Sequence, residues 1–414
     1  MPSRLFPSKA FKTHETGLRR SCVVELIFGF WDNQVMFLVI LFWISTGLIV
    51  YAYLGYPVLL WVLSLLRNRV VITADFTPFV TFIIAVYNEQ ESIAGKLENT
   101  LKLRYPGEKL EIIVASDCSS DQTDEIVHSY KERGIRLIRA SARKGKEAAQ
   151  RLAVQAATGE ILVFSDVAVM LPEDAVSNIV KNFHDPTVGC VSSVDYFIDQ
   201  SGRVSGEGAY VRYEMFLRSL ETRVNSLVGL SGSFFAARQE VCKGVWSDDL
   251  QSDFNTVLNC VRVGLRGVAD PNSIGYYRNI TDERKEYDRK VRTVLRGISV
   301  FMRGLSVVNP LRHTLFAWQI LSHKLCRWLV PFGMIGAFVS NAALAVSWKS
   351  YSYLFLIQVL FYLLALSGIV WKRLLQIPLV KLSSFFLIVN ASILQAWLRY
   401  WAGERLSIWE PSKR

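Results

Sequence analysis

A long interval without charge near the amino terminus places the strongest constraint on this chain. No charged residue occurs between Asp32 and Arg67, and the interval includes the run VMFLVILFWISTGLIVYAYLGYPVLLWVLSLL. About 20 apolar residues cross the hydrocarbon core of a bilayer, whereas the core of a signal peptide is shorter and is followed by a small-residue cleavage site. Two spans divided at Gly55 and Pro57 would each be too short. We therefore expect one long, tilted or kinked anchor helix over residues 34–67.

Three further apolar runs lie near the carboxyl terminus. Residues 328–348 and 350–371 are uncharged and long enough to cross a bilayer. Residues 382–398 are near the lower limit, so their length leaves open whether this run crosses fully. We predict a bundle of about three helices within residues 326–400, and four membrane spans in all.

Basic residues between the apolar runs predict the orientation. Lys372, Arg373 and Lys381 precede the last run, and loops rich in Lys and Arg favour the cytoplasmic side. Counting spans back from there places the globular region in the cytoplasm, as in a multi-pass protein of the inner (plasma) membrane. The side of the amino-terminal tail, residues 1–33, stays open, because one span puts it outside although it is basic. The carboxyl-terminal tail, residues 401–414, is basic as well.

Composition limits the class of protein further. Hydrophobic residues make up 51% of the 414 residues and charged residues 20%, which excludes disorder over most of the chain and a purely soluble enzyme. The net charge of +11 suits nucleic acid, anionic lipid or a polyphosphate substrate without choosing among them. The 6 cysteines stand far apart without a C-x-x-C pair, which excludes a zinc ribbon or a disulfide framework and fits reduced thiols facing the cytosol.

Between residues 78 and 272, apolar β-rich runs alternate with helical patterns. The expected strands are VTFIIAVY (Val80–Tyr87), EIIVASD (Glu111–Asp117), RLIRA (Arg136–Ala140) and ILVFSD (Ile161–Asp166). The expected helices between them are Glu91–Leu103, Asp121–Arg133 and Gly145–Ala157. This order predicts an α/β domain whose mostly parallel sheet carries helices on both faces.

Polar residues follow three of these strands at their carboxyl ends. They are Tyr87-Asn88-Glu89 after the first strand, Asp117 after the second and Asp166 at the end of the last. Ligands bind parallel sheets at this edge. Each residue alone is most simply explained as a helix cap or loop residue. Three successive strands that end in this way predict a site.

Several familiar catalytic motifs are absent from the sequence. No Walker lysine loop, G-x-G-x-x-G or G-x-S-x-G occurs, and the 5 histidines are scattered. ATPase activity, dinucleotide binding and a His-based nucleophilic triad are therefore poorly supported. Carboxylates and a metal ion remain as the expected chemistry.

Seven sequence blocks in a fixed order make the functional interpretation more specific. They are AVYNEQESI, ASDCSSDQTDEI, RKGKEAAQ, FSDVAVMLPEDAV, GLSGSFFAARQEV, SDDLQSDF and RKVRT. Over roughly residues 37–400, this order resembles the membrane-integrated members of glycosyltransferase family 2, which include processive polysaccharide synthases. The resemblance implies a GT-A fold over residues 78–288, followed by interfacial amphipathic helices over residues 289–323.

The resemblance also implies a nucleotide-sugar site. In the family, the loops after the first two strands hold the nucleotide, so Tyr87, Glu89 and Asp117 would contact base and ribose. A carboxylate accepts hydrogen bonds from an imide N–H or a hydroxyl, although Asp117 could instead be a helix cap. Lys146, in the RKGK loop, would lie against the diphosphate, with a solvated lysine at a helix start as the alternative.

Asp166 occupies the first position of the family's D-x-D metal motif, whereas Ala168 stands at the second. A D-x-D pair bridges Mg²⁺ or Mn²⁺ to the substrate phosphates. Because Mg²⁺ often takes only one or two protein carboxylates beside phosphates and waters, Asp166 alone can suffice. The alternative is that Ala168 abolishes metal dependence.

The block SDDL is expected to supply the base that takes the proton of the acceptor hydroxyl. By resemblance this is the second acid of the pair, Asp249, with Asp248 beside it raising its pKa or capping the next helix. Gly229, Ser231 and Gly232 resemble the family's acceptor-side segment, where glycines let the backbone approach a sugar, though they could simply mark a turn.

RKVRT falls where processive synthases carry Q-x-x-R-W. Arg292 matches the arginine, a diphosphate clamp, whereas Arg289 and Thr293 replace the glutamine and the tryptophan. In the synthases the tryptophan stacks beneath the acceptor sugar. Its loss favours short products over a long polymer.

The sequence thus predicts an inverting, metal-dependent glycosyltransferase that serves cell-surface polysaccharide synthesis. Its partners would be a nucleotide-diphospho sugar, a carbohydrate or lipid-linked acceptor, the bilayer and an export or polymerisation protein, with no nucleic acid. The alternatives are a polyprenyl-phosphate sugar transferase and a catalytically silent scaffold that binds nucleotide sugar. Donor sugar, acceptor, processivity and oligomeric state cannot be read from the sequence.

Overall fold

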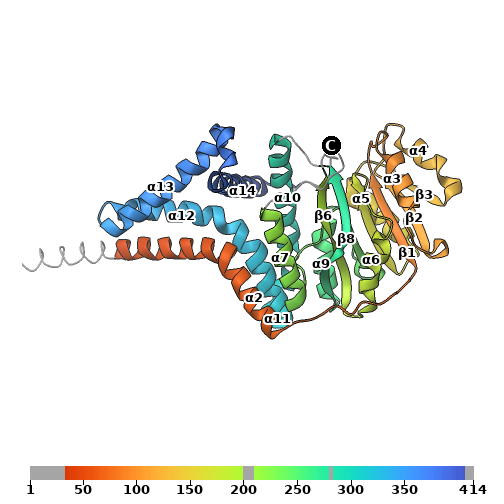
Figure 1. Ribbon diagram of the computed structural model, residues 1–414, viewed down its shortest axis with the longest axis horizontal. Helices are drawn as coiled ribbons and strands as arrows, with labels where there is room; N and C mark the ends of the chain where they lie inside the picture. Colours follow the sequence, from red (N-terminus) through yellow and green to blue (C-terminus); the bar gives the residue numbers. More distant parts are fainter. Residues whose placement is uncertain (1–32, 199–208, 279–282, 406–414) are drawn as a thin grey trace, which may run out of the picture. The chain divides into compact units, whose positions relative to one another are not determined.

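The computed structural model describes residues 33–198, 209–278 and 283–405 (Figure 1). They divide into two compact units. The catalytic unit comprises Tyr51–Trp328 together with the chain from Ile388 onward, and the helical unit comprises the chain up to Val50 together with Leu329–Leu387.

An eight-stranded mixed sheet forms the centre of the catalytic unit, in the order β3-β2-β1-β4-β7-β6-β8-β5. The strands are β1 (Val80–Val86), β2 (Leu110–Ser116), β3 (Ile135–Arg139), β4 (Ile161–Asp166), β5 (Val169–Met170), β6 (Val188–Ile198), β7 (Phe234–Arg238) and β8 (Arg266–Arg278). The pairs β1–β2, β1–β4 and β2–β3 are parallel, whereas β7 runs antiparallel to β4 and β6. β6 and β8 also pair parallel, and β5 runs antiparallel to β8. The predicted α/β sheet with mostly parallel strands is confirmed, and the four expected strands are its adjacent strands β3, β2, β1 and β4.

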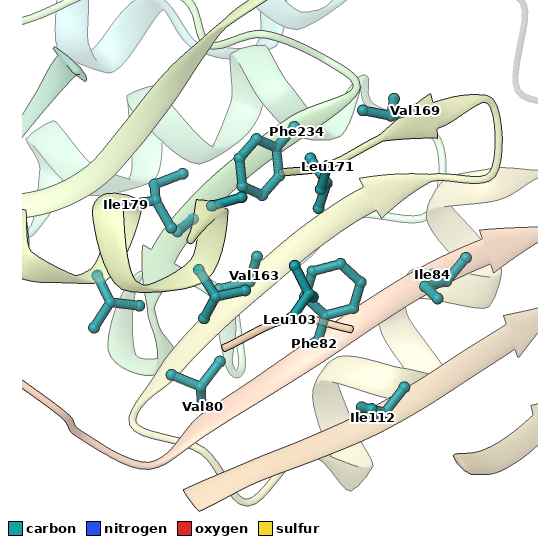
Figure 2. Close-up of a cluster of buried hydrophobic side chains, with 14 of the residues drawn as sticks. Val80, Phe82, Ile84, Leu103, Ile112, Val163, Val169, Leu171, Ile179 and Phe234 are labelled. Carbon is teal, nitrogen blue, oxygen red and sulfur yellow. The ribbon is translucent and has the colours of Figure 1, made fainter. Parts of the chain in front are cut away.

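Helices cover both faces of the sheet. They are α3 (Ile93–Leu101), α4 (Thr123–Ser129), α5 (Lys146–Ala156), α6 (Ala175–Val180), α7 (Ala209–Val224), α8 (Gln239–Cys242), α9 (Ser252–Arg262) and α10 (Glu283–Arg303). Phe82 and Ile84 of β1 belong to the core cluster that also contains α3 and α6 side chains, including Ile179 (Figure 2). Because successive strand residues alternate between faces, the buried Ile83 points to the other face, where α5 packs on β1, β2 and β3.

Two apolar helices belong to the same unit. They are α2 (Tyr56–Leu66), and α11 (Pro310–Ile320) with the π-helical turn Leu321–Cys326. Tyr56 and Leu60 of α2 are buried in a cluster with Leu217, Leu220 and Val224 of α7. A second π-helical turn, Tyr51–Gly55, precedes α2 and interrupts the α-helical geometry of the segment for which one anchor helix was expected.

The helical unit holds residues 33–50, most of α12 (Arg327–Ala345), α13 (Lys349–Val370) and the first part of α14 (Pro378–Trp401). Small residues allow close packing there: a Cβ at Gly336 would lie 2.6 Å from Ser45 Oγ, and one at Gly368 would lie 2.3 Å from Ser384 Oγ. Small residues at helix contacts are typical of membrane bundles.

Four helices of the described chain are long and apolar enough to cross a membrane: Asn33–Leu66, Pro310–Ala345, Lys349–Val370 and Pro378–Trp401. Their number agrees with the predicted spans. The second begins at Pro310, earlier than expected, because α11 continues into α12 through a π-helical turn. The predicted tails at residues 1–33 and 401–414 lie almost entirely outside the described residues.

Candidate active site

A cavity of about 270 Å³ opens at the carboxyl ends of β1 and β4 in the catalytic unit, and we call it the active-site pocket. Charged side chains from α5, β4, β6, α9 and α10 converge on it. Its described lining residues are Glu89, Lys146, Glu147, Asp166, Val167, Ala168, Asp195, Gly232, Ser233, Gln251, Ser252, Asp253, Tyr277, Arg289, Arg292, Thr293 and Arg296. The structure thus brings together five of the residues predicted from sequence: Glu89, Lys146, Asp166, Gly232 and Arg292.

Lys146 is a fixed, buried cation of this pocket. Its ammonium forms an ion pair with Asp166 and donates to the backbone carbonyl of Gly232 over 3.0 Å. Only 8% of its side chain is exposed. This burial excludes the solvated lysine that the sequence left open.

Asp117 sets the backbone that positions Lys146. Its two carboxylate oxygens accept the backbone N–H groups of Lys144 and Gly145, each over 2.8 Å. Gly145 has φ +104°, a conformation that favours glycine, and α5 begins at the next residue. Asp117 is buried and is not among the described lining residues, and its hydrogen bonds to the two N–H groups just before α5 correspond to the helix-cap alternative, while its contact with base and ribose stays a prediction.

Tyr87 also lies outside the pocket lining. The Arg143 guanidinium stacks on its ring, 4.0 Å from the centroid, so Tyr87 and the RKGK loop are joined by a cation–π contact. Glu89 does reach the pocket, and its backbone N–H donates to Thr123 Oγ1 over 2.8 Å.

The expected base pair lies away from the active-site pocket. Asp249 forms an ion pair with the exposed Arg303 and accepts a hydrogen bond from Ser247 over 2.6 Å, and Asp248 pairs with Arg151 over 2.6 Å. Burial alone would raise the pKa of Asp249, but Ser247 and Arg303 outweigh it and lower that pKa. Neither aspartate is among the described lining residues. The geometry therefore gives Asp249 no support as the base, because its charge is held by surface partners.

Asp253 lies in the pocket instead, in the first turn of α9. Its side chain is buried, and burial raises the pKa of its carboxyl although Lys146 and Arg296 act against the rise. Gln251 Nε2 donates to its Oδ2 over 3.1 Å. Asp253 was missed because the sequence offers two acidic positions four residues apart. The signal that separates them is helical: Asp253 is at the start of a helix whose other residues are nearly all buried.

A second acid that the sequence did not single out is Asp195, on β6. Its Oδ2 accepts the Ser231 hydroxyl over 2.6 Å, and its Oδ1 accepts the Ser193 hydroxyl over 3.2 Å. Burial raises the pKa of Asp195, and the charge of Asp166 adds to the rise. Ser231 therefore orients Asp195 and does not itself line the pocket.

Of the predicted acceptor-side glycines, only Gly232 lines the pocket. A Cβ at Gly232 would lie 3.0 Å from Asp253 Oδ2, so a larger residue there would crowd this carboxylate. Gly229 lies outside the lining, where its carbonyl accepts from Arg218 over 3.0 Å.

One face of α10 supplies cations to the pocket. Arg289, Arg292 and Arg296 are three and four positions apart and therefore share this face. Arg296 forms an ion pair with Glu147, whose side chain is only 2% exposed. Thr293 is in the pocket as well, with its hydroxyl donating to the carbonyl of Arg289 over 2.9 Å.

The donor set is compatible with a divalent ion that also takes substrate phosphates. Within the described residues, no three His, Cys, Asp or Glu side chains form a complete ligand group. Asp166 and Asp195 nevertheless present two carboxylates to one cavity. One or two carboxylates with phosphates and waters are what Mg²⁺ ordinarily takes.

Comparisons with known proteins bear on the family and the fold. The model of the Glycosyl transferase family 2 matches residues 81–246. A poly-beta-1,6-N-acetyl-D-glucosamine synthase of Staphylococcus aureus strain COL is 30% identical over 193 residues, 45% of this chain and 46% of the synthase. A synthase of the same name from Staphylococcus epidermidis is 28% identical over 179 residues, 41% of this chain and 42% of that protein. The chain spans less than half the length of these curated relatives.

The fold has a close structural counterpart. A mannosyltransferase from Pyrobaculum calidifontis, in complex with GDP-Man and Mn²⁺, superposes with a TM-score of 0.67 at 23% identity, covering 88% of this chain and 100% of that chain. The fold is therefore GT-A. Residues 81–246 match the model of glycosyltransferase family 2, and the curated matches are named polysaccharide synthases, as the sequence blocks predict.

Proposed function

We propose that this protein is an inverting glycosyltransferase that moves a sugar from a nucleotide-diphospho sugar to a carbohydrate or lipid-linked acceptor at the membrane. The observation that carries the proposal is the buried Asp253 carboxylate in the same pocket as Lys146, Asp166 and Arg292. A base and a set of diphosphate-binding groups are what a direct displacement at the anomeric carbon requires.

In this mechanism Asp253 accepts the proton of the acceptor hydroxyl as its oxygen attacks the anomeric carbon. Burial raises the pKa of Asp253, which makes its carboxylate a stronger base than an exposed aspartate. Arg292, with its planar fork, and Lys146 are placed to bind the leaving diphosphate. Attack from the face opposite the leaving group inverts the anomeric centre.

Asp166 and Asp195 would hold Mg²⁺ or Mn²⁺ together with the substrate phosphates. When bound, such an ion neutralises charge on the leaving nucleotide. Lys146 forms an ion pair with Asp166, so this lysine orients the carboxylate that would take the metal. Ala168 leaves the D-x-D motif incomplete, and Asp195 on β6 is a further aspartate that lines the cavity.

We further propose that the domain works on the cytoplasmic side of the inner (plasma) membrane, in the synthesis of cell-surface polysaccharide. The four apolar helices and the basic loop at Lys372, Arg373 and Lys381 support this placement. The polymer named for the staphylococcal relatives makes N-acetylglucosamine the first donor sugar to try, and GDP-Man is the second.

The decisive experiment incubates the full-length protein, reconstituted in lipid, with radiolabelled nucleotide sugars and Mg²⁺ or Mn²⁺. We expect transfer from one donor that is lost in Asp253→Asn and kept in the matched variant Asp249→Asn. Loss in Asp249→Asn with retention in Asp253→Asn would reverse the assignment of the base. Donor binding without transfer under any condition would favour the silent scaffold.

A further inference from the structure

A second cavity, of about 450 Å³, lies in the catalytic unit, and we call it the basic cavity. It shares none of its described lining residues with the active-site pocket. Arg69, Arg266, Arg312 and His313 line it, and within the described chain no carboxylate does. The cavity therefore has an excess of positive charge that the reaction does not use.

Within the described residues, one of these arginines forms an ion pair. Arg266 is buried and forms an ion pair with Asp185 over 2.9 Å. Arg69 reaches only the amide oxygen of Asn225, over 3.5 Å. Burial lowers the pKa of Arg69, and the charges of Arg266 and Arg67 lower it further, as expected in a positive field.

Arg312 is the most accessible cation of the basic cavity. Its side chain is exposed, and among the described residues its guanidinium has no ion pair or hydrogen bond. Next to it, His313 departs from helical geometry, with φ −130° and ψ 47°, although it lies within α11. The start of this helix is thus bent where it meets the cavity.

These cations adjoin two candidate membrane segments. Arg69 follows the segment Asn33–Leu66, and Arg312 lies near the start of Pro310–Ala345. Apolar side chains beside them are unusually exposed: Leu66 is 82% exposed and Leu311 92%. Arginines beside exposed apolar side chains at the end of a membrane segment are typical of the headgroup region of a bilayer.

We propose that the basic cavity binds the phosphate group of an anionic phospholipid headgroup. Arginine forks match phosphate oxygens in geometry and charge. A lipid is favoured over a soluble phosphate because Leu66 and Leu311 would contact the acyl region while Arg69 and Arg312 hold the headgroup. The cavity also meets the far end of α9 at Val261, and Asp253 begins the same helix, so a bound lipid would stabilise the element that carries the proposed base.

The test measures binding of short-chain phosphatidylglycerol to the delipidated full-length protein in detergent, with short-chain phosphatidylcholine as the zwitterionic comparison that has no net charge. The variant is Arg69→Gln/Arg312→Gln. The matched control is Arg104→Gln/Arg133→Gln, which removes two exposed arginines from surface ion pairs elsewhere in the same unit. Arg312→Gln alone, at an exposed side chain, serves as a variant that leaves folding intact, and thermal unfolding checks all of them.

We expect phosphatidylglycerol to bind about tenfold more weakly to the double variant and with unchanged affinity to the control. Equal affinity of the wild type and both arginine variants would overturn the proposal. A third arm adds inorganic phosphate. Inorganic phosphate that binds the wild type as tightly as phosphatidylglycerol does would support the phosphate site but overturn the lipid as its source, whereas displacement of the lipid only at much higher phosphate concentrations would support both.

Discussion

Asp249 and Asp253 lie close together in the sequence, but the structure gives their carboxylates different surroundings. Asp249 is held by Arg303 and Ser247, which lower its pKa, whereas Asp253 is buried in the active-site pocket with a raised pKa. A carboxylate is a stronger general base when its charged form is poorly stabilised, because its pKa is then higher. Asp253 meets this condition and Asp249 does not.

The first prediction at this scale concerns turnover. Asp253→Asn should lower the transfer rate by about 100-fold or more, because an amide cannot accept the acceptor proton. Donor affinity should stay within a few-fold, since the diphosphate-binding cations are on other elements. Single-turnover transfer and equilibrium binding of the donor separate the two effects, and a wild-type rate would remove Asp253 from this role.

The same substitution should stabilise the fold at neutral pH. Burial raises the pKa of Asp253 in the folded state above its unfolded value, so its ionised form costs free energy once the pH exceeds the folded pKa. A neutral Asn removes this cost, and we expect a gain in the free energy of unfolding at pH 7. Below pH 4 the gain should vanish, because the aspartate is then neutral as well. Unfolding curves of both proteins at the two pH values check this.

Ala168 carries a further prediction. Its position is exposed in the pocket, so Ala168→Asp has room for a second carboxylate of the D-x-D motif. We expect about tenfold tighter binding of Mn²⁺ in the presence of the nucleotide product, with no requirement for the change in transfer. Mn²⁺ electron paramagnetic resonance titration reads the affinity directly. Wild-type transfer that is equally fast in excess chelator would contradict metal dependence.

At the scale of elements, α5 and α10 are joined by a buried ion pair. Glu147 follows Lys146 on α5 and pairs with Arg296 on α10, and both side chains are almost fully buried. Arg296→Met should destabilise the protein by about 3 kcal/mol, because it leaves a buried charge without its partner. The double variant Glu147→Gln/Arg296→Met should recover most of this loss. Chemical unfolding of the wild type, of Arg296→Met, of Glu147→Gln and of the double variant measures the coupling, and additive losses would exclude the pair as the link.

The sequence predicted the four adjacent strands β3, β2, β1 and β4 far better than the rest of the sheet. β1, β2 and β4 are continuous apolar runs followed by polar loops, so local pattern alone identifies them. β6 and β8 are long strands whose pairing joins residues far apart in sequence, with irregular register at Ser192 and Val194, and no local pattern marks such a pairing. Asp195 was missed for this reason, because only the register of β6 brings it to the cavity.

Site residues near a strand end were likewise only partly predictable. Asp117 and Asp166 follow neighbouring strands with the same pattern, yet Asp166 lines the pocket and Asp117 is used by the backbone of Lys144 and Gly145. The difference depends on where the next loop passes. That path is a property of the tertiary structure and not of the motif.

At the scale of the whole molecule, the length of the sugar product is the property that can be tested most directly. Thr293 stands in the pocket where a stacking tryptophan would grip a terminal sugar, and its small side chain offers much less contact area. We expect products of one or a few added sugars, and longer products for Thr293→Trp with Thr293→Val as the matched control. Sizing of radiolabelled product at low enzyme-to-acceptor ratio decides this. Long chains from the wild type would mean that another side chain grips the acceptor.

Gly232 has a consequence for attempts to redesign this enzyme. Its carbonyl accepts from Lys146, which is proposed to bind the donor, while the space beside its Cα is occupied by Asp253, which is proposed to activate the acceptor. The backbone at Gly232 therefore contacts both the residue proposed to bind the donor and the residue proposed to activate the acceptor. A side chain added there would disturb both residues. Selectivity for the donor and for the acceptor can be tuned separately only from positions further out, such as Thr293 on one side and Glu89 on the other.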